Sequence, residues 1–293
     1  MVDARLITLL TLLEEKNYTN TAKKLYITQP AVTHHIKSLE KEFDIELFKN
    51  SKSFELTHAG AILKEYAEFA VNQYSQFQTA LNRQMDRKIY NIAFTITSFP
   101  CLSSISIFKK ISEDNIGFNF YIYDYDTIQK GLMDGSIDFA FIDNSFDSAK
   151  FESISIKFEK ICIVCDALGS HAGLKRITRE QLSTTPIILL NDTNGVTKAV
   201  NQALTLKNIR LKKNMILYTN QIESMIELIK LYDGLAFMYE SSAIKYENDK
   251  LIKRLDMLNF QVTQNIYILY SRQSFLDSTT LSIIEKLKGV EAE

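Results

Sequence analysis

The chain of 293 residues has few cysteines and histidines and no long apolar run. Its three cysteines follow no disulfide-framework spacing, which fits a reducing compartment. Its four histidines are scattered and form no zinc-ligand pattern. No apolar stretch reaches membrane-spanning length, and Met1 leads into an amphipathic segment rather than a signal peptide. We therefore expect a cytoplasmic protein with no membrane association, no metal ion and no cofactor.

Motifs of the common enzyme classes are also missing. The sequence has no nucleophile elbow, phosphate loop or metalloprotease helix, and no dinucleotide fingerprint follows its first predicted strand. Asp124 and Asp126 are close carboxylates, but they lie on or after a strand among three tyrosines, so we expect them to face solvent. These absences argue against an enzyme.

Glycine and proline are absent from residues 61 through 99. Within this segment apolar residues recur every three or four positions, which predicts one face of a helix. About 28 residues at about 1.5 Å each would give roughly 42 Å of helix, more than a small domain needs. We expect a linker helix that pairs with its copy in a second subunit; the alternative is a helix packed on its own domain. The apolar face comprises Ile62, Tyr66, Ala70, Tyr74, Phe77, Leu81 and Met85.

Residues 18–60 carry the clearest functional signal. Apolar residues at helical spacing predict two short helices, a third recognition helix and a small wing, a shape that enters the major groove of DNA. Thr19 and Thr28 are placed as N-caps of the second and third helices, and Pro30 falls in a first turn where its missing N–H costs nothing. The exposed face of the third helix is predicted to carry Gln29, Thr33, His34 and Lys37, whose side chains suit base edges and phosphates.

Five submotifs occur in this region: T-A-K-K-L at 21–25, T-Q-P-A-V-T at 28–33, I-K-S-L-E at 36–40, L-F at 47–48 and L-T-H-A-G at 56–60. In their order and spacing they resemble the N-terminal domain of LysR-type transcriptional regulators. The length of the chain and its later αβ pattern also agree with that family. The resemblance implies a winged-helix regulator that binds an imperfect inverted repeat of double-stranded DNA as a dimer.

The two turns of the predicted domain depart from the family pattern. Residues 16–18 stand where relatives usually have a glycine, and residues 43–44 stand where they have Leu-Gly. Asn17 and Asp44 belong to the residue types that best tolerate a left-handed backbone, so we expect both turns to form.

The predicted DNA contacts depart from the family at two positions. Asn50 replaces a wing arginine, with Lys49 and Lys52 as nearby cations, and His34 takes a position often held by arginine. Imidazole is a weaker partner for a base or phosphate than a bidentate guanidinium. We expect base readout by Gln29, Thr33 and His34. The full predicted set is Thr28, Gln29, Pro30, Thr33, His34, Lys37, Lys49 and Lys52.

The formal net charge is only −1, but positive charge is concentrated on the reading surface. Residues 16–38 contain four lysines and no carboxylate. A footprint this small predicts salt-sensitive DNA binding that depends on a dimer or a larger oligomer for its affinity.

After residue 89, short apolar strands alternate with helices, which predicts mainly parallel sheets with helices on both faces. The resemblance implies two Rossmann-like subdomains similar to periplasmic solute-binding proteins. The expected domains are a winged helix-turn-helix over 1–60, a linker helix over 61–89 and an α/β effector domain over 90–293. By the resemblance, subdomain I comprises 90–160 and 266–293, and subdomain II comprises 161–265. The predicted strands are 91–97, 118–125, 138–143, 160–165, 187–190, 214–218, 235–238 and 265–270.

An effector in such a fold would lie between the subdomains, at strand ends and helix N-termini. Hydroxyls and amides beside free backbone N–H groups would suit a small carboxylate or another anion, so an anionic effector is one option. The same residues could instead be ordinary caps and loop residues. The candidates are Thr97, Ser98, Asn144, Ser145, Thr193, Asn194, Asn220 and Gln221.

The cysteines leave a second sensing mechanism open. Cys162 and Cys165 are three apart on a predicted strand, so their thiols should point to opposite faces and lie in the core. Cys101, near the expected cleft, is the better candidate for a reactive thiol. The alternatives to a metabolite-responsive regulator are therefore a thiol-based redox sensor of the same family, or an architectural DNA binder without effector. The resemblance also implies assembly of dimers into a tetramer and leaves contact with RNA polymerase open.

Overall fold

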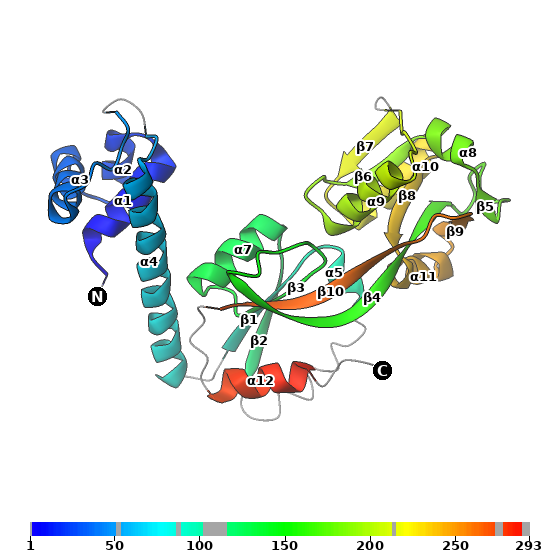
Figure 1. The fold of residues 1–293 in the computed structure, drawn as a ribbon. Coiled ribbons are helices and arrows are strands. Elements are labelled where there is room, and N and C mark those ends of the chain that lie inside the picture. The colour runs from blue at the N-terminus through cyan, green and yellow to red at the C-terminus, as the bar shows by residue number, and fades with distance from the viewer. Residues whose placement is uncertain are drawn as a thin grey trace. The chain divides into compact units, whose positions relative to one another are not determined.

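The computed structural model describes residues 2–50, 54–85, 89–101, 116–212, 215–272 and 278–288. The chain divides into two compact units, Met1–Met85 and Asp86–Glu293, each with its own core. The first unit contains α1 (Ala4–Glu15), α2 (Tyr18–Lys24), α3 (Gln29–Phe43) and α4 (His58–Met85), with an isolated antiparallel bridge between Phe48 and Leu56 in the wing (Figure 1).

The turn between α1 and α2 forms without glycine, but not through the residue predicted to allow it. Lys16 takes the left-handed conformation, with φ 48° and ψ 33°. Asn17 is the N-cap of α2, and its side chain accepts from the N–H groups of Thr19 at 2.8 Å and Asn20 at 3.0 Å. The predicted cap at Thr19 is therefore wrong, because α2 begins one residue before it. The second turn is as predicted, since Asp44 is left-handed with φ 53°.

Leucine and isoleucine side chains of α1, α3 and α4 meet in one core, against which Tyr18 of α2 packs. Leu9 of α1, Leu39 of α3 and Leu63 of α4 are buried in the same cluster. Gly60 closes the packing between α4 and the wing, because a Cβ there would lie 2.3 Å from the carbonyl oxygen of Leu47. Thr28 caps α3 as predicted, accepting from the N–H of Ala31 at 3.4 Å, and Pro30 lies in the first turn.

The second unit is built on one sheet with strand order β2-β1-β3-β10-β4-β8-β6-β7, to which β9 and β5 are added beside β4. Its strands are β1 (Ile89–Phe94), β2 (Gly117–Ile122), β3 (Phe139–Ile142), β4 (Phe151–Asp166), β5 (Arg176–Ile177), β6 (Ile187–Leu190), β7 (Ile216–Thr219), β8 (Leu235–Tyr239), β9 (Ile252–Met257) and β10 (Val262–Ser271). Its helices are α5 (Ser98–Cys101), α7 (Tyr125–Asp134), α8 (Arg179–Thr184), α9 (Gly195–Leu206), α10 (Ile222–Tyr232), α11 (Glu240–Asn248) and α12 (Ser278–Lys288).

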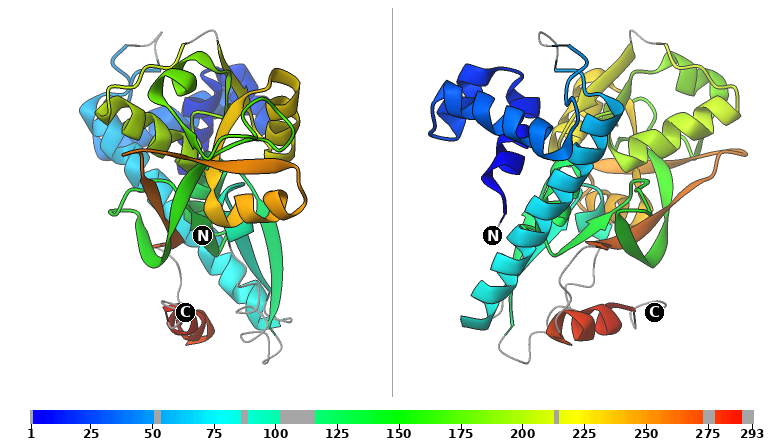
Figure 2. Two further views of the ribbon diagram at one scale, coloured as in Figure 1. Left: turned by 90° about the vertical axis from the view of Figure 1, so that its right-hand side faces the viewer. Right: turned by 60° about the vertical axis from the view of Figure 1, so that its left-hand side comes forward.

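Two lobes share this sheet (Figures 1 and 2). The first lobe contains β1, β2 and β3, and the second contains β6, β7 and β8. Strands β4 and β10 pair with each other from Val262–Ile161 to Ser271–Phe151 and run through both lobes. The proposed subdomain limits at residues 161 and 265 fall inside these two crossing strands.

Mainly parallel pairing was predicted, and the parallel pairs lie inside the lobes. Strand β1 pairs in parallel with β2 and β3, and β6 pairs in parallel with β7 and β8. Strand β10 is antiparallel to β3, and β4 is antiparallel to β8, β9 and β10. The chain crosses between lobes once in each direction, so the two crossing strands must run antiparallel to each other.

Sequence patterns missed strands that carry charged residues. Strand β4 begins at Phe151 rather than at the predicted residue 160. Its first half was missed because it mixes apolar residues with serines, lysines and glutamates and is only partly buried. Strands β5 and β9 were not predicted. In β9 only Ile252 and Leu255 are buried, so its sequence lacks a strong apolar signal.

We predict that Lys16→Gly stabilises the first unit. A left-handed backbone costs a lysine about 1–2 kcal/mol, of which the greater flexibility of unfolded glycine cancels part, leaving a gain of about 0.5–1 kcal/mol. Calorimetric unfolding of the full chain should show the higher transition temperature. Lys23→Gly, within the helix α2, is the control; it should lower the free energy of unfolding by about 1 kcal/mol and so lower the transition temperature. An equal loss from both variants would contradict the role given to Lys16.

Candidate functional site

The start of α3 presents the predicted DNA-reading residues on one exposed face. Val32, Ile36 and Leu39 bury the opposite face. Thr33 is half-buried, and its hydroxyl donates to the carbonyl of Gln29 at 3.2 Å. The exposed residues of the predicted set on this helix and its cap are Thr28, Gln29, Pro30, His34 and Lys37.

Polar contacts with α1 fix the position of α3. The hydroxyl of Thr8 lies 2.8 Å from Nδ1 of His35, one residue beyond the exposed His34. Arg5 donates to the Ser38 hydroxyl at 2.9 Å and forms an ion pair with Glu42 at 2.6 Å. These contacts hold the reading helix against the domain along its length, so its exposed side chains are presented on a rigid support.

One of the two lysines predicted to contact DNA from the wing has a partner within its own domain. Lys49 is exposed, but its Nζ lies 3.4 Å from Glu55 across the bridge, so part of its charge is neutralised. Lys52 lies outside the described residues.

Tyr26 was not predicted as a site residue. It lies in the turn between α2 and α3 with φ 56°, and its side chain is 96% exposed. Its aromatic side chain therefore lies in solvent beside the first turn of α3. Its only signal in the sequence was an aromatic residue within a turn, which did not distinguish it from a core residue.

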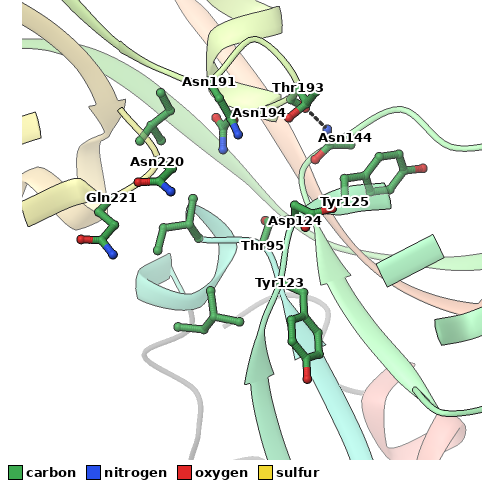
Figure 3. Close-up of a pocket in the computed structure, with 13 residues that line it drawn as sticks. Thr95, Tyr123, Asp124, Tyr125, Asn144, Asn191, Thr193, Asn194, Asn220 and Gln221 are labelled. Atoms are coloured by element: carbon green, nitrogen blue, oxygen red, sulfur yellow. Dashed lines mark hydrogen bonds between the residues drawn. The ribbon is translucent and has the colours of Figure 1, made fainter. Parts of the chain in front are cut away.

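A pocket of about 390 Å³ lies between the two lobes of the second unit (Figure 3). Its walls come from the ends of β1, β2 and β6 and from the starts of α9 and α10, where the polar candidates were expected. The lining residues are Thr95, Ile96, Ile122, Tyr123, Asp124, Tyr125, Asn144, Leu190, Asn191, Thr193, Asn194, Asn220 and Gln221.

The structure divides the predicted effector residues into two groups. Asn144, Thr193, Asn194, Asn220 and Gln221 line the pocket. The remaining three do not appear in its lining. The hydroxyl of Thr97 donates to Asp143, that of Ser98 donates to the carbonyl of Phe141, and Ser145 is exposed.

The carboxylate of Asp143 is fully buried where the lobes meet. It accepts from the hydroxyls of Thr97 at 2.5 Å, Tyr239 at 2.9 Å and Thr95 at 3.0 Å. Tyr239 ends β8 in the second lobe, whereas Thr95, Thr97 and Asp143 follow strands of the first. Asn194 of the second lobe donates to the Thr97 hydroxyl at 3.2 Å. One carboxylate thus connects both lobes through hydrogen bonds.

The start of α9 is packed directly against this carboxylate. A Cβ on Gly195 would lie 2.5 Å from the carbonyl oxygen of Asp143, so a larger residue would push the lobes apart. The side chain of Gln264, on the crossing strand β10, donates to the same carbonyl at 2.5 Å. Burial raises the pKa of the Asp143 carboxyl, while the hydroxyls of Thr97, Tyr239 and Thr95 oppose that rise.

The pocket wall contributed by the first lobe carries an ionised carboxylate. Asp124 is the N-cap of α7, and its two oxygens accept from the N–H of Thr127 at 2.9 Å and from its hydroxyl at 2.8 Å. The bond from the Thr127 N–H is the largest cause that lowers the pKa of Asp124. Asp124 and Asp126 are exposed, as predicted.

Cys162 and Cys165 are buried in different core clusters on opposite faces of β4, as their spacing predicted. Burial raises the pKa of Cys162 to about 12 and that of Cys165 to about 11, so both thiols stay protonated at neutral pH. They do not favour redox sensing. The side chain of Cys101 lies outside the described residues.

The described part of the chain contains no group of three or more side chains suited to hold a metal ion. None of the helices in the described ranges is long and apolar enough to cross a bilayer.

Comparisons with known proteins match both units. Residues 4–61 match the family described as "Bacterial regulatory helix-turn-helix protein, lysR family", and residues 113–291 match "LysR substrate binding domain". The "Probable RuBisCO transcriptional regulator" of Phaeodactylum tricornutum is 24% identical over 289 residues, covering 95% of this chain and 94% of that protein. CysL of Bacillus subtilis is 25% identical over 269 residues, covering 90% and 89%. The crystal structure of CbnR, a LysR family transcriptional regulator, superposes over 100% of both chains with a TM-score of 0.62 at 17% identity.

A helix-turn-helix unit followed by a two-lobed α/β unit defines a DNA-binding transcriptional regulator with an effector-binding domain. The chain belongs to the LysR family. The fold class predicted from the sequence is confirmed. Because the family consists of transcriptional regulators, the prediction that the protein is not an enzyme is also confirmed.

We predict that Asp143→Asn changes how stability depends on pH. Burial raises the folded-state pKa of Asp143, so the folded chain holds a proton there more tightly than the unfolded chain. The stabilisation from this proton is fully present below the unfolded pKa and is lost as pH rises through the folded pKa. The melting temperature of wild type relative to Asp143→Asn should therefore fall as pH rises from acid towards neutral.

The measurement is thermal unfolding of both proteins over a pH series. Asp126→Asn, at an exposed position, serves as the matched control. A melting-temperature difference between wild type and Asp143→Asn that stays constant across the series would contradict the pKa direction.

Proposed function

We propose that the protein binds an inverted-repeat operator as a homodimer through α3, and that a small molecule in the interlobe pocket controls this binding. The main support for the proposal is that α3 has one buried face and one exposed polar face. Its buried face is fixed to α1, while Gln29, His34 and Lys37 remain exposed on the other face. Amide and imidazole groups suit base edges, and the ammonium suits phosphate.

Each residue of the reading surface has a proposed role. Gln29 and His34 read bases, with Thr33 beside them and Pro30 in apolar contact. The Thr33 hydroxyl already donates to the Gln29 carbonyl, so it meets DNA as an acceptor or through its methyl group. Lys37, Lys49 and Lys52 contact the backbone. Tyr26 joins this group because its phenol is exposed beside the cap of α3.

We predict that Gln29→Ala lowers specific DNA affinity by about tenfold or more without loss of fold. A good bidentate base contact contributes about 1–3 kcal/mol, and the exposed Gln29 supports no core. The measurement is a binding titration of full-length protein on operator DNA and on unrelated DNA, with the melting temperature as a fold check. Gln202→Ala, at an exposed position of α9, is the control. Unchanged operator affinity in Gln29→Ala would remove Gln29 from the reading surface.

We propose that α4 forms the dimer interface. Leu63 and Ala67 pack into the core of their own domain, whereas the neighbouring apolar side chains remain exposed over several turns. An exposed apolar face of this length is costly in water and is covered when two such helices pair. The exposed members are Ile62, Tyr66, Phe69, Phe77 and Leu81.

We predict that Phe77→Glu weakens the dimer, raising its dissociation constant at least about tenfold, or about 1.4 kcal/mol. Phe77 is 49% exposed, and a carboxylate at this position would be buried without a partner if the helices pair. Light scattering over a concentration series measures the change. Gln78→Glu is the control on the next exposed position. If both substitutions raise the dissociation constant equally, or if neither raises it, the interface lies elsewhere.

Effector control follows from where the pocket lies. Its walls come from both lobes, so a ligand that contacts both would stabilise one lobe arrangement over another. The arrangement it selects would set the spacing of the two DNA-reading domains in the dimer. Association of dimers into a tetramer, and contact with RNA polymerase, extend this proposal.

A further inference from the structure

The wall of the interlobe pocket contains one charged side chain among the described residues, the carboxylate of Asp124. The described lining includes no lysine, arginine or histidine that could pair with an anion. Its other polar groups are side-chain amides, hydroxyls and phenols. A ligand whose net charge is negative would therefore meet a like charge that no cation in the described lining offsets.

Asn144 supplies an acceptor that the protein leaves without a donor. The residue is 2% exposed, and its Nδ2 donates to the carbonyl oxygen of Thr193 at 2.8 Å, which fixes the orientation of the amide. Its Oδ1 is buried and has no hydrogen-bond donor among the described residues. In Figure 3 this oxygen points from the wall towards the space between Asn194 and Thr95. Because buried acceptors normally receive a hydrogen bond, we expect a bound molecule to donate to Oδ1.

The opposite wall offers amide and backbone N–H donors. Gln221 is the N-cap of α10 but makes no side-chain cap hydrogen bond to the helix, and both Asn220 and Gln221 line the pocket. The first-turn N–H groups of this helix of 11 residues favour an acceptor or a negative group, and the acidic residue already in that turn, Glu223, does not line the pocket. The start of α9 differs, because Asn194 already caps the N–H of Val196 at 2.9 Å.

We propose that the effector is a small zwitterion with no net charge. Its ammonium group would bind Asp124 and Oδ1 of Asn144 on the first lobe, and its carboxylate would bind the start of α10 on the second. A pocket of about 390 Å³ holds a molecule of amino-acid size. This inference rests on the effector function proposed above, and it replaces the expectation of an anionic effector with a ligand whose two charges match the two walls.

The test is a thermal-shift screen of the full-length protein with the common L-amino acids, succinate and inorganic phosphate. At least one amino acid should raise the melting temperature, and succinate and phosphate should not. For that amino acid, the analogue without the amino group and the analogue without the carboxylate should each bind at least about tenfold more weakly. Stabilisation by succinate or phosphate alone, or by none of these compounds, overturns the proposal.

Asp124→Asn tests the role of the charged wall. Asparagine keeps the helix cap, so α7 is preserved, but the partner of the ammonium group is lost. Affinity for the amino acid should fall at least about tenfold, whereas affinity for its deaminated analogue should not fall. Asp126→Asn is the matched control on the same helix. Equal affinity of Asp124→Asn and wild type for the amino acid overturns the assignment.

Operator binding without added compound, compared between wild type and Gln29→Ala, separates the two proposals. If that binding follows the prediction while no amino acid stabilises the protein, only the ligand class is wrong. If operator binding itself fails, the proposed function is wrong whatever the screen shows.

Discussion

The arrangement of the second unit depends on one buried carboxylate. Asp143 has no contact with water, and its oxygens accept three hydroxyl hydrogen bonds that come from both lobes. Burying a carboxylate is unfavourable unless its hydrogen bonds are made, so a movement of the lobes that breaks these bonds without admitting water would leave the carboxylate unsatisfied. The absence of a Cβ at Gly195 lets α9 start against the same residue. The junction therefore has a strongly preferred geometry.

The DNA-binding unit meets a different constraint, because α3 supplies both part of the domain core and the proposed reading surface. Leu39 and Ile36 give α3 its apolar face, and Arg5 binds both Ser38 and Glu42 from the side. This attachment allows the first turn of α3 to carry unpaired polar groups into solvent. The positions are set by periodicity and capping, both of which are local.

Local patterns explain why much of the first unit was predictable. The cap at Thr28 and the turn at Asp44 depend on a few neighbouring residues, and both were predicted correctly. Thr19 was misplaced because Asn17 is an equally good cap two residues earlier, and only the observed helix start decides between them. Strand β9 escaped prediction because its stability comes from pairing with β4, a contact distant in the sequence.

The residues of the pocket could be predicted from the sequence only in part. Five of the polar residues predicted at strand ends line the pocket. Thr97 instead donates to the buried Asp143, whereas Asn144, the next residue after that aspartate, lines the pocket. Their difference depends on which side of a strand end faces the other lobe, and that is set by the crossing of β4 and β10. The many amide side chains in the sequence did not indicate that only one wall of the pocket carries a charged residue.

Asn194 connects the pocket to the junction. Its Oδ1 caps α9, its Nδ2 donates to the hydroxyl of Thr97, and Thr97 in turn donates to Asp143. The same side chain lines the pocket. A ligand group that bonds to Asn194 must either compete with these contacts or strengthen their present geometry. Either effect changes the free energy of the lobe junction, because the carboxylate behind Thr97 cannot lose a hydrogen bond without cost. Under the proposed function, effector binding and lobe arrangement would therefore be coupled through these shared hydrogen bonds.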